Sequence, residues 1–394
     1  MVLVIVAPGQ GAQSPGFLEP WLEDPDFADR LNWLSAVSGL DLAHYGTVAD
    51  AETIRDTAVA QPLLVASSLL AALALFPHPA DAFSRIGAVA GHSVGEIAAA
   101  SGAGVVSAEQ AMVFVRERGR AMAEASAKTP TGMTAVLGGD RDDVLATLER
   151  HGLTPANDNG AGQVVAAGTL EQLQALADDG PDKARLIPLS VAGAFHTEHM
   201  QHAVTVLTRL ARAMTTRDTR TRLISNRDGQ VIHDGREVLT RLVTQVRNPV
   251  RWDLCMQSMS DLGVTGILEM PPAGTLVGIA KRQLKGVETF ALKTPDQRDD
   301  ARAFADKHGD ASPIDSTPTW RMLVSPGKGT FRQTVDIPVG SVLVPDLVIG
   351  AVENLRGRTQ VVAPYGGTIV EWVVEDGDLV SPGQPLVRLH PESE

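Results

Sequence analysis

The sequence predicts an α/β protein with a mainly parallel sheet, an inserted β-α-β-β-α-β subdomain and an all-β C-terminal region. Two continuous apolar runs, Val2–Ala7 and Ile86–Ala90, have the composition of interior parallel strands, and both lead into glycine-rich turns. Short strand and helix patterns alternate over residues 131–191. From about residue 320 the sequence changes to short strands separated by glycine turns.

The composition is that of a globular protein with room for two or three domains. The chain has 394 residues, of which 44% are hydrophobic, and a formal net charge of -13. This charge argues against nucleic acid as the main partner and gives no reason to expect a membrane surface. No apolar run approaches the ~20 residues that span a bilayer, and Val2–Ala7 is too short for a signal peptide. Because the single Cys255 permits no disulfide and no cysteine metal cluster, we expect a cytoplasmic protein without a bound metal.

The central motif is the G-x-S-x-G sequence Gly91-His92-Ser93-Val94-Gly95, which lies between a predicted strand and a predicted helix. A strand that enters a helix through two glycines makes a sharp, strained turn. The serine at its apex exposes its oxygen near the helix N-terminus. We therefore expect a hydrolase-like α/β core with Ser93 as a candidate nucleophile, although such turns also occur for purely structural reasons.

Glycines also follow the first strand, in Pro8-Gly9-Gln10-Gly11-Ala12-Gln13. Loops at this end of a parallel sheet line ligand crevices, and their backbone N–H groups can face an oxyanion. Helical patterns follow at Asp26–Gly39, Gln61–Leu75 and Ser107–Ala127. Pro62 is expected near the first turn of the second helix, where proline is tolerated.

The third of these helices carries Arg116, Arg118 and Arg120. Positions 116 and 120 share a helix face, whereas position 118 points elsewhere. We therefore expect at most one side of this triple to be buried and specific.

The inserted subdomain is predicted from a ferredoxin-like order of short elements. Its strands are expected at Thr131–Gly138, Leu153–Asn157, Gln163–Ala167 and Lys183–Val191, with helices at Arg141–Gly152 and Thr169–Asp179 and a turn at Asn159-Gly160. The chain then returns to the main body through Phe195-His196, and this histidine could be a general base for the serine. Further strands are expected at Leu223–Asn226 and Gly266–Met270, and a helix at Glu237–Val246 contains Gln245.

Collected in order, five motifs resemble those of malonyl-CoA:acyl carrier protein transacylases, the acyltransferases of fatty acid and polyketide synthesis. They are Gly9-Gln10-Gly11-Ala12-Gln13, Gly91-His92-Ser93-Val94-Gly95-Glu96, Arg118, Phe195-His196 and Gln245-x-x-Asn248-Pro249. The resemblance covers roughly residues 1–295. It implies a large α/β subdomain formed by residues 1–130 and 192–293, with residues 131–191 as the small ferredoxin-like subdomain.

The resemblance also implies an [acyl-carrier-protein] S-malonyltransferase that works by a ping-pong mechanism. Ser93 would carry the malonyl group as an ester, and His196 would be its general base, oriented by a main-chain carbonyl near Gln245. The backbone N–H groups of Gln10 and Val94 would form the oxyanion hole.

Four further positions would bind the acyl group. Arg118 would grip the free malonyl carboxylate, because a guanidinium binds a carboxylate in a fixed bidentate geometry. Gln61 and Met122 match positions beside the acyl pocket. Phe195 fills space where relatives that accept methylmalonyl tend to have smaller residues, which favours malonyl.

The tail has two parts. Residues 294–319, rich in Asp, Ala and Pro, are predicted to be a linker. Residues 320–390 resemble the biotinyl/lipoyl carrier domain, a small flattened β-barrel whose hairpin tip carries a modified lysine. Here the tip reads Glu353-Asn354-Leu355-Arg356-Gly357. Since arginine cannot form the amide link to biotin or lipoate, Arg356 predicts an unmodified domain used for docking to a protein partner or for assembly.

Three other functions remain open from the sequence. A serine hydrolase or thioesterase would use the same motif, but would gain nothing from a buried arginine at position 118. A malonyl transferase subunit of a malonate decarboxylase would use the same chemistry on another carrier. A non-catalytic scaffold would act through the C-terminal domain alone.

The leading hypothesis has a coenzyme A thioester as substrate and an acyl carrier protein as partner. Carrier proteins are generally acidic, as is this chain, so docking would need a local basic patch. Arg116, Arg120, Lys183 and Arg185 are candidates, or are ordinary surface charges.

Overall fold

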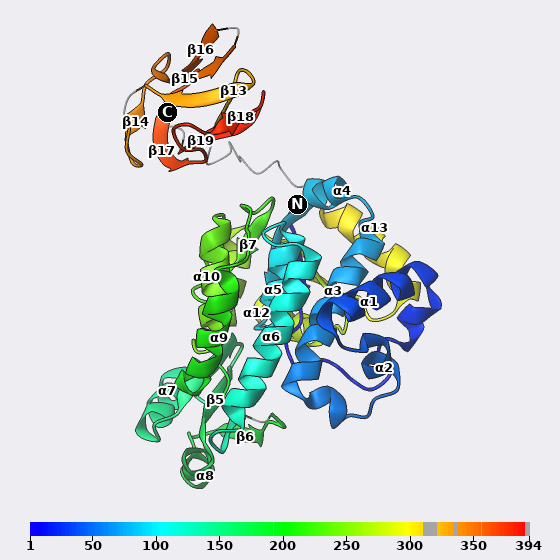
Figure 1. The fold of residues 1–394 in the computed structure, drawn as a ribbon. Helices are drawn as coiled ribbons and strands as arrows, with labels where there is room; N and C mark the ends of the chain where they lie inside the picture. Colours follow the sequence, from blue (N-terminus) through cyan, green and yellow to red (C-terminus); the bar gives the residue numbers. More distant parts are fainter. Residues whose placement is uncertain (192, 310–320, 335–336, 356, 391–394) are drawn as a thin grey trace. The chain divides into compact units, whose positions relative to one another are not determined.

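A computed structural model of the chain divides into two compact units, Met1–Ile314 and Asp315–Glu394 (Figure 1). The structure describes residues 1–191, 193–309, 321–334, 337–355 and 357–390.

The first unit is built around a six-stranded sheet with the order β11-β10-β1-β2-β7-β8. Neighbouring strands pair in parallel, apart from the antiparallel pair β7–β8 at one edge. The strands are β1 (Leu3–Ala7), β2 (Ile86–Gly91), β7 (Arg222–Ile224), β8 (Val231–Ile232), β10 (Gly266–Glu269) and β11 (Glu288–Ala291).

Strand β1 explains why the central strands are continuously apolar. Successive side chains point to opposite faces of a sheet, and here both faces are covered. Leu3 and Ile5 belong to the core on one face, whereas Val4 and Val6 belong to the core on the other. The predicted α/β core with a mainly parallel sheet is therefore confirmed.

Helices cover both faces of this sheet. On one face α3, α5 and α6 pack against one another (Figure 1), and α11 and α12 supply much of the core on the other. The helices of the first unit outside the insertion are α1 (Pro25–Ser38), α2 (Leu42–Thr47), α3 (Thr57–Leu75), α4 (Pro79–Arg85), α5 (Gly95–Gly102), α6 (Ala108–Ser126), α9 (Gln201–Ala211), α10 (Gly235–Gln245), α11 (Trp252–Asp261), α12 (Thr275–Gln283) and α13 (Arg298–His308). Short 3-10 turns lie at Glu19–Glu23, Thr53–Arg55, Glu198–Met200 and Pro295–Gln297.

Helix α3 begins earlier than the sequence suggested. Its N-cap is Asp56, whose side chain accepts a hydrogen bond from the Ala58 N–H, so Pro62 lies inside the helix rather than in its first turn. The capping carboxylate, and not the proline, sets the start. The helix is long and apolar enough to span a membrane, but 78% of its most apolar window is buried inside the protein. Its apolar residues therefore form core.

The inserted subdomain has a five-stranded sheet with the order β6-β3-β5-β4-β9. Its elements follow the predicted β-α-β-β-α-β order, and β9 joins β4 from a later part of the chain. One detail of the prediction is wrong: β4 continues through Gly160, so the turn lies at Ala161-Gly162, where both residues have positive φ. The elements are β3 (Thr131–Gly138), α7 (Arg141–Arg150), β4 (Thr154–Gly160), β5 (Gln163–Thr169), α8 (Leu170–Asp178), β6 (Ala184–Pro188) and β9 (Val250–Arg251).

The predicted linker at 294–319 is partly wrong. Residues Arg298–His308 form helix α13, which buries Ala301, Ala305 and His308. A helix that contributes mainly alanines to its apolar stripe has little hydrophobic periodicity in its sequence, which is why the pattern went unrecognised. The later part of the predicted linker, from residue 310, lies outside the described residues.

The second unit contains two four-stranded sheets around a small apolar core, as expected for an all-β region. The orders are β12-β19-β17-β14 and β16-β15-β13-β18. The strands are β12 (Arg321–Val324), β13 (Gly329–Gln333), β14 (Val342–Leu343), β15 (Val348–Asn354), β16 (Gly357–Val362), β17 (Gly367–Trp372), β18 (Leu379–Val380) and β19 (Pro385–His390).

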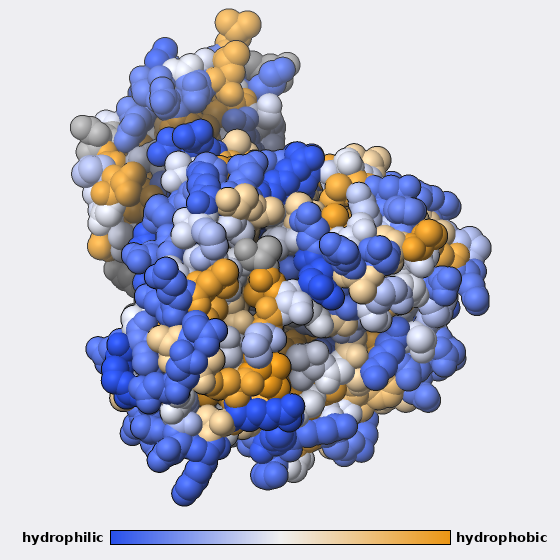
Figure 2. Space-filling view, turned by 90° about the horizontal axis from the view of Figure 1, so that it is seen from below, coloured by the Kyte–Doolittle hydropathy of each residue, from blue (hydrophilic) through white to orange (hydrophobic). Residues whose placement is uncertain are grey.

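The face of the molecule shown in Figure 2 is mainly polar: hydrophilic residues predominate and the hydrophobic patches between them are smaller. Most large apolar side chains are buried in the two cores of the main sheet, in the core of the insertion or in the core of the second unit. Buried charged or polar residues such as Arg118, Glu96 and His196 are therefore exceptions in the first unit, and their burial needs an explanation.

Two glycines of helix α5 provide a test of the fold. A Cβ at Gly95 would lie 2.2 Å from the Ala7 carbonyl oxygen, whereas a Cβ at Gly102 would have nothing within 4 Å. We expect Gly95→Ala to lower the free energy of unfolding by about 3 kcal/mol or more, because backbone must move. Gly102→Ala should leave it unchanged or raise it by up to about 1 kcal/mol. Denaturant unfolding measures both, and equal stability of the two variants would contradict the close packing of α5 on β1.

Candidate active site

The serine turn joins β2 to α5 through two glycines that allow very close backbone contact. A Cβ at Gly91 would lie 2.0 Å from the Gly95 carbonyl carbon. Ser93 at the apex has a φ of 52°, a left-handed conformation that is uncommon for a residue with a side chain. This is the strained strand–turn–helix geometry that the motif predicted, and it places the serine at the carboxyl edge of the parallel sheet.

A histidine from the segment after the insertion reaches this serine. Ser93 Oγ lies 2.8 Å from His196 Nε2, although the two residues are 103 positions apart. His196 Nδ1 lies 2.8 Å from the main-chain oxygen of Gln245. Since a carbonyl oxygen only accepts, Nδ1 carries the proton and Nε2 is free to accept from the serine hydroxyl. The predicted pairing of Ser93 with His196, and the role of the Gln245 carbonyl, agree with these distances.

The histidine is held in its neutral form. Burial, together with the nearby positive charge of Arg118, lowers the pKa of His196 to about 3. A neutral imidazole is the form that can accept a proton from serine.

Arg118 is the strongest electrostatic feature of the site. Its side chain is fully buried, whereas Arg116 and Arg120 on the same helix are partly exposed and both lie near Glu117. The prediction that only one face of this triple is buried is therefore confirmed. Burial lowers the pKa of Arg118 to about 9, which leaves the guanidinium charged at neutral pH.

The contacts of Arg118 are to neutral oxygens. Nη1 donates to Gln61 Oε1 at 2.7 Å, and Nη2 donates to Gln245 Oε1 at 2.9 Å and to Ser93 Oγ at 3.3 Å. Its Nε has no partner, and none of the ion pairs within 4 Å among the described residues involves Arg118. A buried cation without a carboxylate is costly, and it is suited to receive an anionic ligand beside the nucleophile.

The other predicted site residues lie at or near this centre. Gln61 Nε2 points to the sulfur of Met122 at 3.5 Å, which links these two positions to Arg118. Phe195, the residue before the histidine, is buried in the main core. Among the described residues, the backbone N–H groups of Gln10 and Val94 donate no hydrogen bond within the protein.

Two residues that the sequence analysis did not assign to the site complete it. Asn226, which follows β7, accepts the Ser93 N–H through Oδ1 at 2.7 Å and donates from Nδ2 to the Gly91 carbonyl at 2.6 Å. Glu96 on α5 is buried and accepts from the Asn226 N–H at 3.0 Å and from Gln245 Nε2. A glutamate within an alanine-rich helix start, and an asparagine at a strand's carboxyl end, were the signals that could have identified them.

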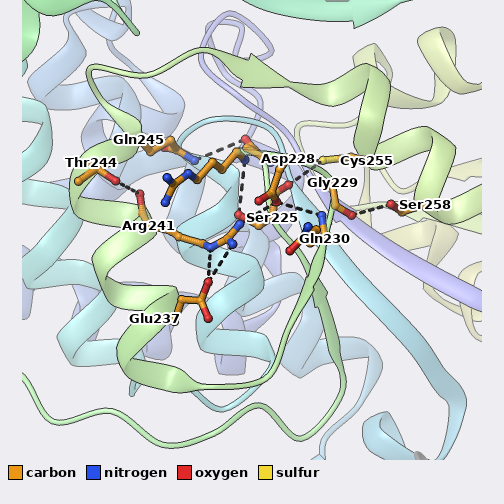
Figure 3. Close-up of polar contacts among 12 residues, drawn as sticks. Ser225, Asp228, Gly229, Gln230, Glu237, Arg241, Thr244, Gln245, Cys255 and Ser258 are labelled. Atoms are coloured by element: carbon orange, nitrogen blue, oxygen red, sulfur yellow. Dashed lines mark hydrogen bonds and ion pairs between the residues drawn. The ribbon is translucent and has the colours of Figure 1, made fainter.

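Helix α10, which ends at Gln245, is fixed by the ion pairs of a buried arginine, Arg241. Arg241 contacts Asp228 at 2.7 Å and Glu237 at 2.8 Å, and its side chain is only 8% exposed. Figure 3 shows these groups between α10 and the loop after β7, with Gln245 on the same helix. Since this loop also contains Asn226, the ion pairs hold Asn226 and Gln245 in place relative to each other.

Comparison with known proteins agrees with this geometry. The family model described as "Acyl transferase domain" matches residues 4–313. The chain is 50% identical over 299 residues to the malonyl CoA-acyl carrier protein transacylase of Mycobacterium bovis, a match that covers 76% of this chain and 99% of that protein.

Solved structures show the same similarity. The crystal structure of MCAT from Mycobacterium tuberculosis has a TM-score of 0.74 and 49% identity, covering 77% of this chain and all of that one. PlMCAT in complex with AntF, described as a type II PKS acyl-carrier protein with its malonyl-transacylase, has a TM-score of 0.71 and 27% identity, covering 77% of this chain and 99% of that chain. The matched family model, the relatives and the Ser93–His196 pair together show that this chain belongs to the acyl transferase family that includes the malonyl CoA-acyl carrier protein transacylases.

Proposed function

We propose that this protein transfers a malonyl group from malonyl-CoA to the phosphopantetheine thiol of an acyl carrier protein, through an ester on Ser93. The observation that carries the proposal is the buried Arg118 guanidinium, which lies 3.3 Å from the oxygen of a histidine-paired serine. In a malonyl thioester, a single methylene group separates the reactive carbonyl from the free carboxylate. A cation beside the nucleophile therefore selects this substrate by both charge and length.

In the first half-reaction His196 Nε2 removes the Ser93 proton as Oγ attacks the thioester carbonyl. The resulting oxyanion accepts hydrogen bonds from the free N–H groups of Gln10 and Val94, a stabilisation worth roughly 3–4 kcal/mol per donor. The intermediate then collapses, the carbon–sulfur bond breaks, and His196 returns its proton to the leaving thiolate of coenzyme A. In the second half-reaction the carrier thiol attacks the malonyl ester in the same way, and Ser93 is regenerated.

Three further residues, Gln61, Met122 and Phe195, affect which acyl group the site accepts. Gln61 holds one edge of the Arg118 guanidinium and contacts Met122, so both shape the space around the acyl carboxylate. Phe195 adds bulk next to His196, which favours malonyl over branched analogues by about 1–3 kcal/mol.

A serine hydrolase or thioesterase is disfavoured by the same site. Its acyl pocket would be apolar or neutral, and its histidine would be paired with a carboxylate. Here His196 is oriented by a main-chain carbonyl, and the charged guanidinium of Arg118 lies where the acyl group is expected to bind.

The carrier protein is expected to approach through local positive charge. Lys183 and Arg185 are exposed, whereas Arg116 and Arg120 lie close to Glu117, at 2.8 Å and 3.9 Å, which weakens their contribution. A cytoplasmic location fits a chain whose single cysteine is a buried thiol.

For the second unit we propose a biotinyl/lipoyl-like domain that carries no prosthetic group and binds a protein partner. Two antiparallel four-stranded sheets, one of which contains the β15–β16 hairpin, support this assignment. Leu355 at the hairpin tip is completely exposed, as a contact residue would be. Arg356, which replaces the modified lysine, lies outside the described residues.

Mass analysis tests the covalent intermediate. After incubation with malonyl-CoA, the wild-type protein should gain the mass of one malonyl group. Ser93→Ala should gain none, and His196→Ala should be acylated about 100- to 10,000-fold more slowly, because the general base is lost. Uptake of the label by Ser93→Ala would rule out the ester mechanism.

The proposed binding of the malonyl carboxylate by Arg118 is tested by comparing malonyl-CoA with acetyl-CoA as substrates. Arg118→Ala should reduce kcat/KM for malonyl-CoA relative to acetyl-CoA by at least about 10- to 100-fold, since a hydrogen bond to a charged group is worth roughly 1.5–3 kcal/mol. Arg150→Ala, which removes an exposed arginine of α7, is the control and should leave the ratio unchanged. A wild-type enzyme that uses both thioesters equally would instead favour a hydrolase.

The unmodified state of the second unit is tested by intact mass. Full-length protein produced together with biotin and lipoate ligases should have the mass of the unmodified chain, because an arginine side chain cannot form the required amide. A known lipoyl-accepting domain in the same cells is the positive control. An added biotinyl or lipoyl mass would contradict the proposal.

A further inference from the structure

Two functional groups of the site, His196 and Arg118, both donate hydrogen bonds to Gln245. Gln245 accepts from His196 Nδ1 through its main-chain oxygen at 2.8 Å and from Arg118 Nη2 through Oε1 at 2.9 Å. The two ends of its amide have opposite requirements, because Oε1 accepts and Nε2 donates. Rotating the amide by half a turn would set an NH₂ against the guanidinium, donor against donor.

The orientation of this amide is fixed by acceptors on its other side. Gln245 Nε2 donates to Glu96 Oε2 and lies 3.4 Å from Asn226 Oδ1. The second oxygen of Glu96 accepts from the backbone N–H of Asn226 at 3.0 Å. That backbone donor cannot be inverted. Besides the Ser225 side chain, the carboxylate therefore has one fixed partner, the Asn226 N–H, and one partner that it orients, the Gln245 amide.

Asn226 connects the same carboxylate to the nucleophile turn. Its side chain bridges the Ser93 N–H and the Gly91 carbonyl, at 2.7 Å and 2.6 Å. This bridge stabilises the left-handed conformation of Ser93. Glu96 itself is only 2% exposed, and it touches none of the reacting groups directly.

We propose that Glu96 is the positioning residue of this acyl site, and that its carboxylate sets the Gln245 amide so that Arg118 is presented to the acyl carboxylate. The inference rests on the proposed malonyl transfer and adds a determinant of acyl selectivity beyond the residues that contact the substrate. The ionised form of Glu96 is required because both of its carboxylate oxygens must accept. Acyl selectivity is therefore measured above pH 7, since burial raises the pKa of Glu96 to about 7.

The substitution Glu96→Gln has a specific consequence. The new amide must direct its oxygen to the fixed Asn226 N–H, so its NH₂ faces Gln245. Gln245 then inverts its amide to accept this hydrogen bond and turns its own NH₂ toward Arg118. The guanidinium loses one oxygen partner and faces a donor, which displaces it from the acyl carboxylate.

This mechanism predicts a change in selectivity rather than a general loss of activity. Glu96→Gln should lower the ratio of kcat/KM for malonyl-CoA to that for acetyl-CoA by about 10-fold or more, chiefly through KM for malonyl-CoA. In the Gln245→Met background, Glu96→Gln should lower the ratio no further. Glu96 acts through the Gln245 amide, which this background lacks.

The matched control is Glu269→Gln. Glu269 is another fully buried glutamate, and it accepts from the backbone N–H groups of Gly274, Leu276 and Val277 at the start of α12. Its substitution should lower the midpoint of thermal unfolding but leave the malonyl-to-acetyl ratio within about twofold of wild type, because a merely structural loss affects both substrates equally.

The outcomes separate this inference from the function on which it rests. A wild-type enzyme without a preference for malonyl-CoA would refute the proposed function. A wild-type preference that Glu96→Gln retains would overturn the role of Glu96, and so would a ratio that Glu96→Gln lowers further in the Gln245→Met background. If Glu96→Gln alone does not fold, the comparison of the double variant with Gln245→Met decides: equal ratios support the role, and a lower ratio in the double variant overturns it.

Discussion

The structure depends on keeping a positive charge fully buried beside a nucleophile without giving it a carboxylate of its own. The Arg118 guanidinium is hydrogen-bonded to two glutamine oxygens and to the serine, which offsets part of the cost of removing it from water. Neutral partners orient the cation but do not cancel its charge. The positive charge of Arg118 therefore remains available to bind an anionic acyl group, whereas a carboxylate paired directly with Arg118 would have neutralised it.

This constraint explains the organisation of the surrounding fold. The groups that meet at the site come from the β2–α5 turn, from α6, from the segment after the insertion and from the end of α10. A parallel sheet collects its loops at the carboxyl edge of its strands, so distant parts of the chain converge there. The inserted subdomain leaves the main body after α6 and rejoins it just before His196, and the ion pairs of Arg241 hold α10 in place.

Several features could be inferred from residues alone because their cause is local. The continuous apolar runs of β1 and β2 follow from burial on both faces, and the two glycines around Ser93 follow from a turn in which any Cβ would collide with backbone. The features that were missed have a non-local cause. Helix α13 buries alanines against an existing surface, and α3 starts at a capping aspartate rather than at its proline. Their sequences carry little signal without the neighbours that they pack against.

The residues alone identify the α/β core, the nucleophile turn and the serine, histidine and arginine of the site, because each has a characteristic residue type in a local context. The three-dimensional arrangement was needed to show that these groups share one centre and that Glu96 and Asn226 lie behind it. A buried carboxylate that orients an amide 149 positions away has no local signature. Its effect arises from the pairing of donors and acceptors in space, which the order of residues along the chain does not encode directly.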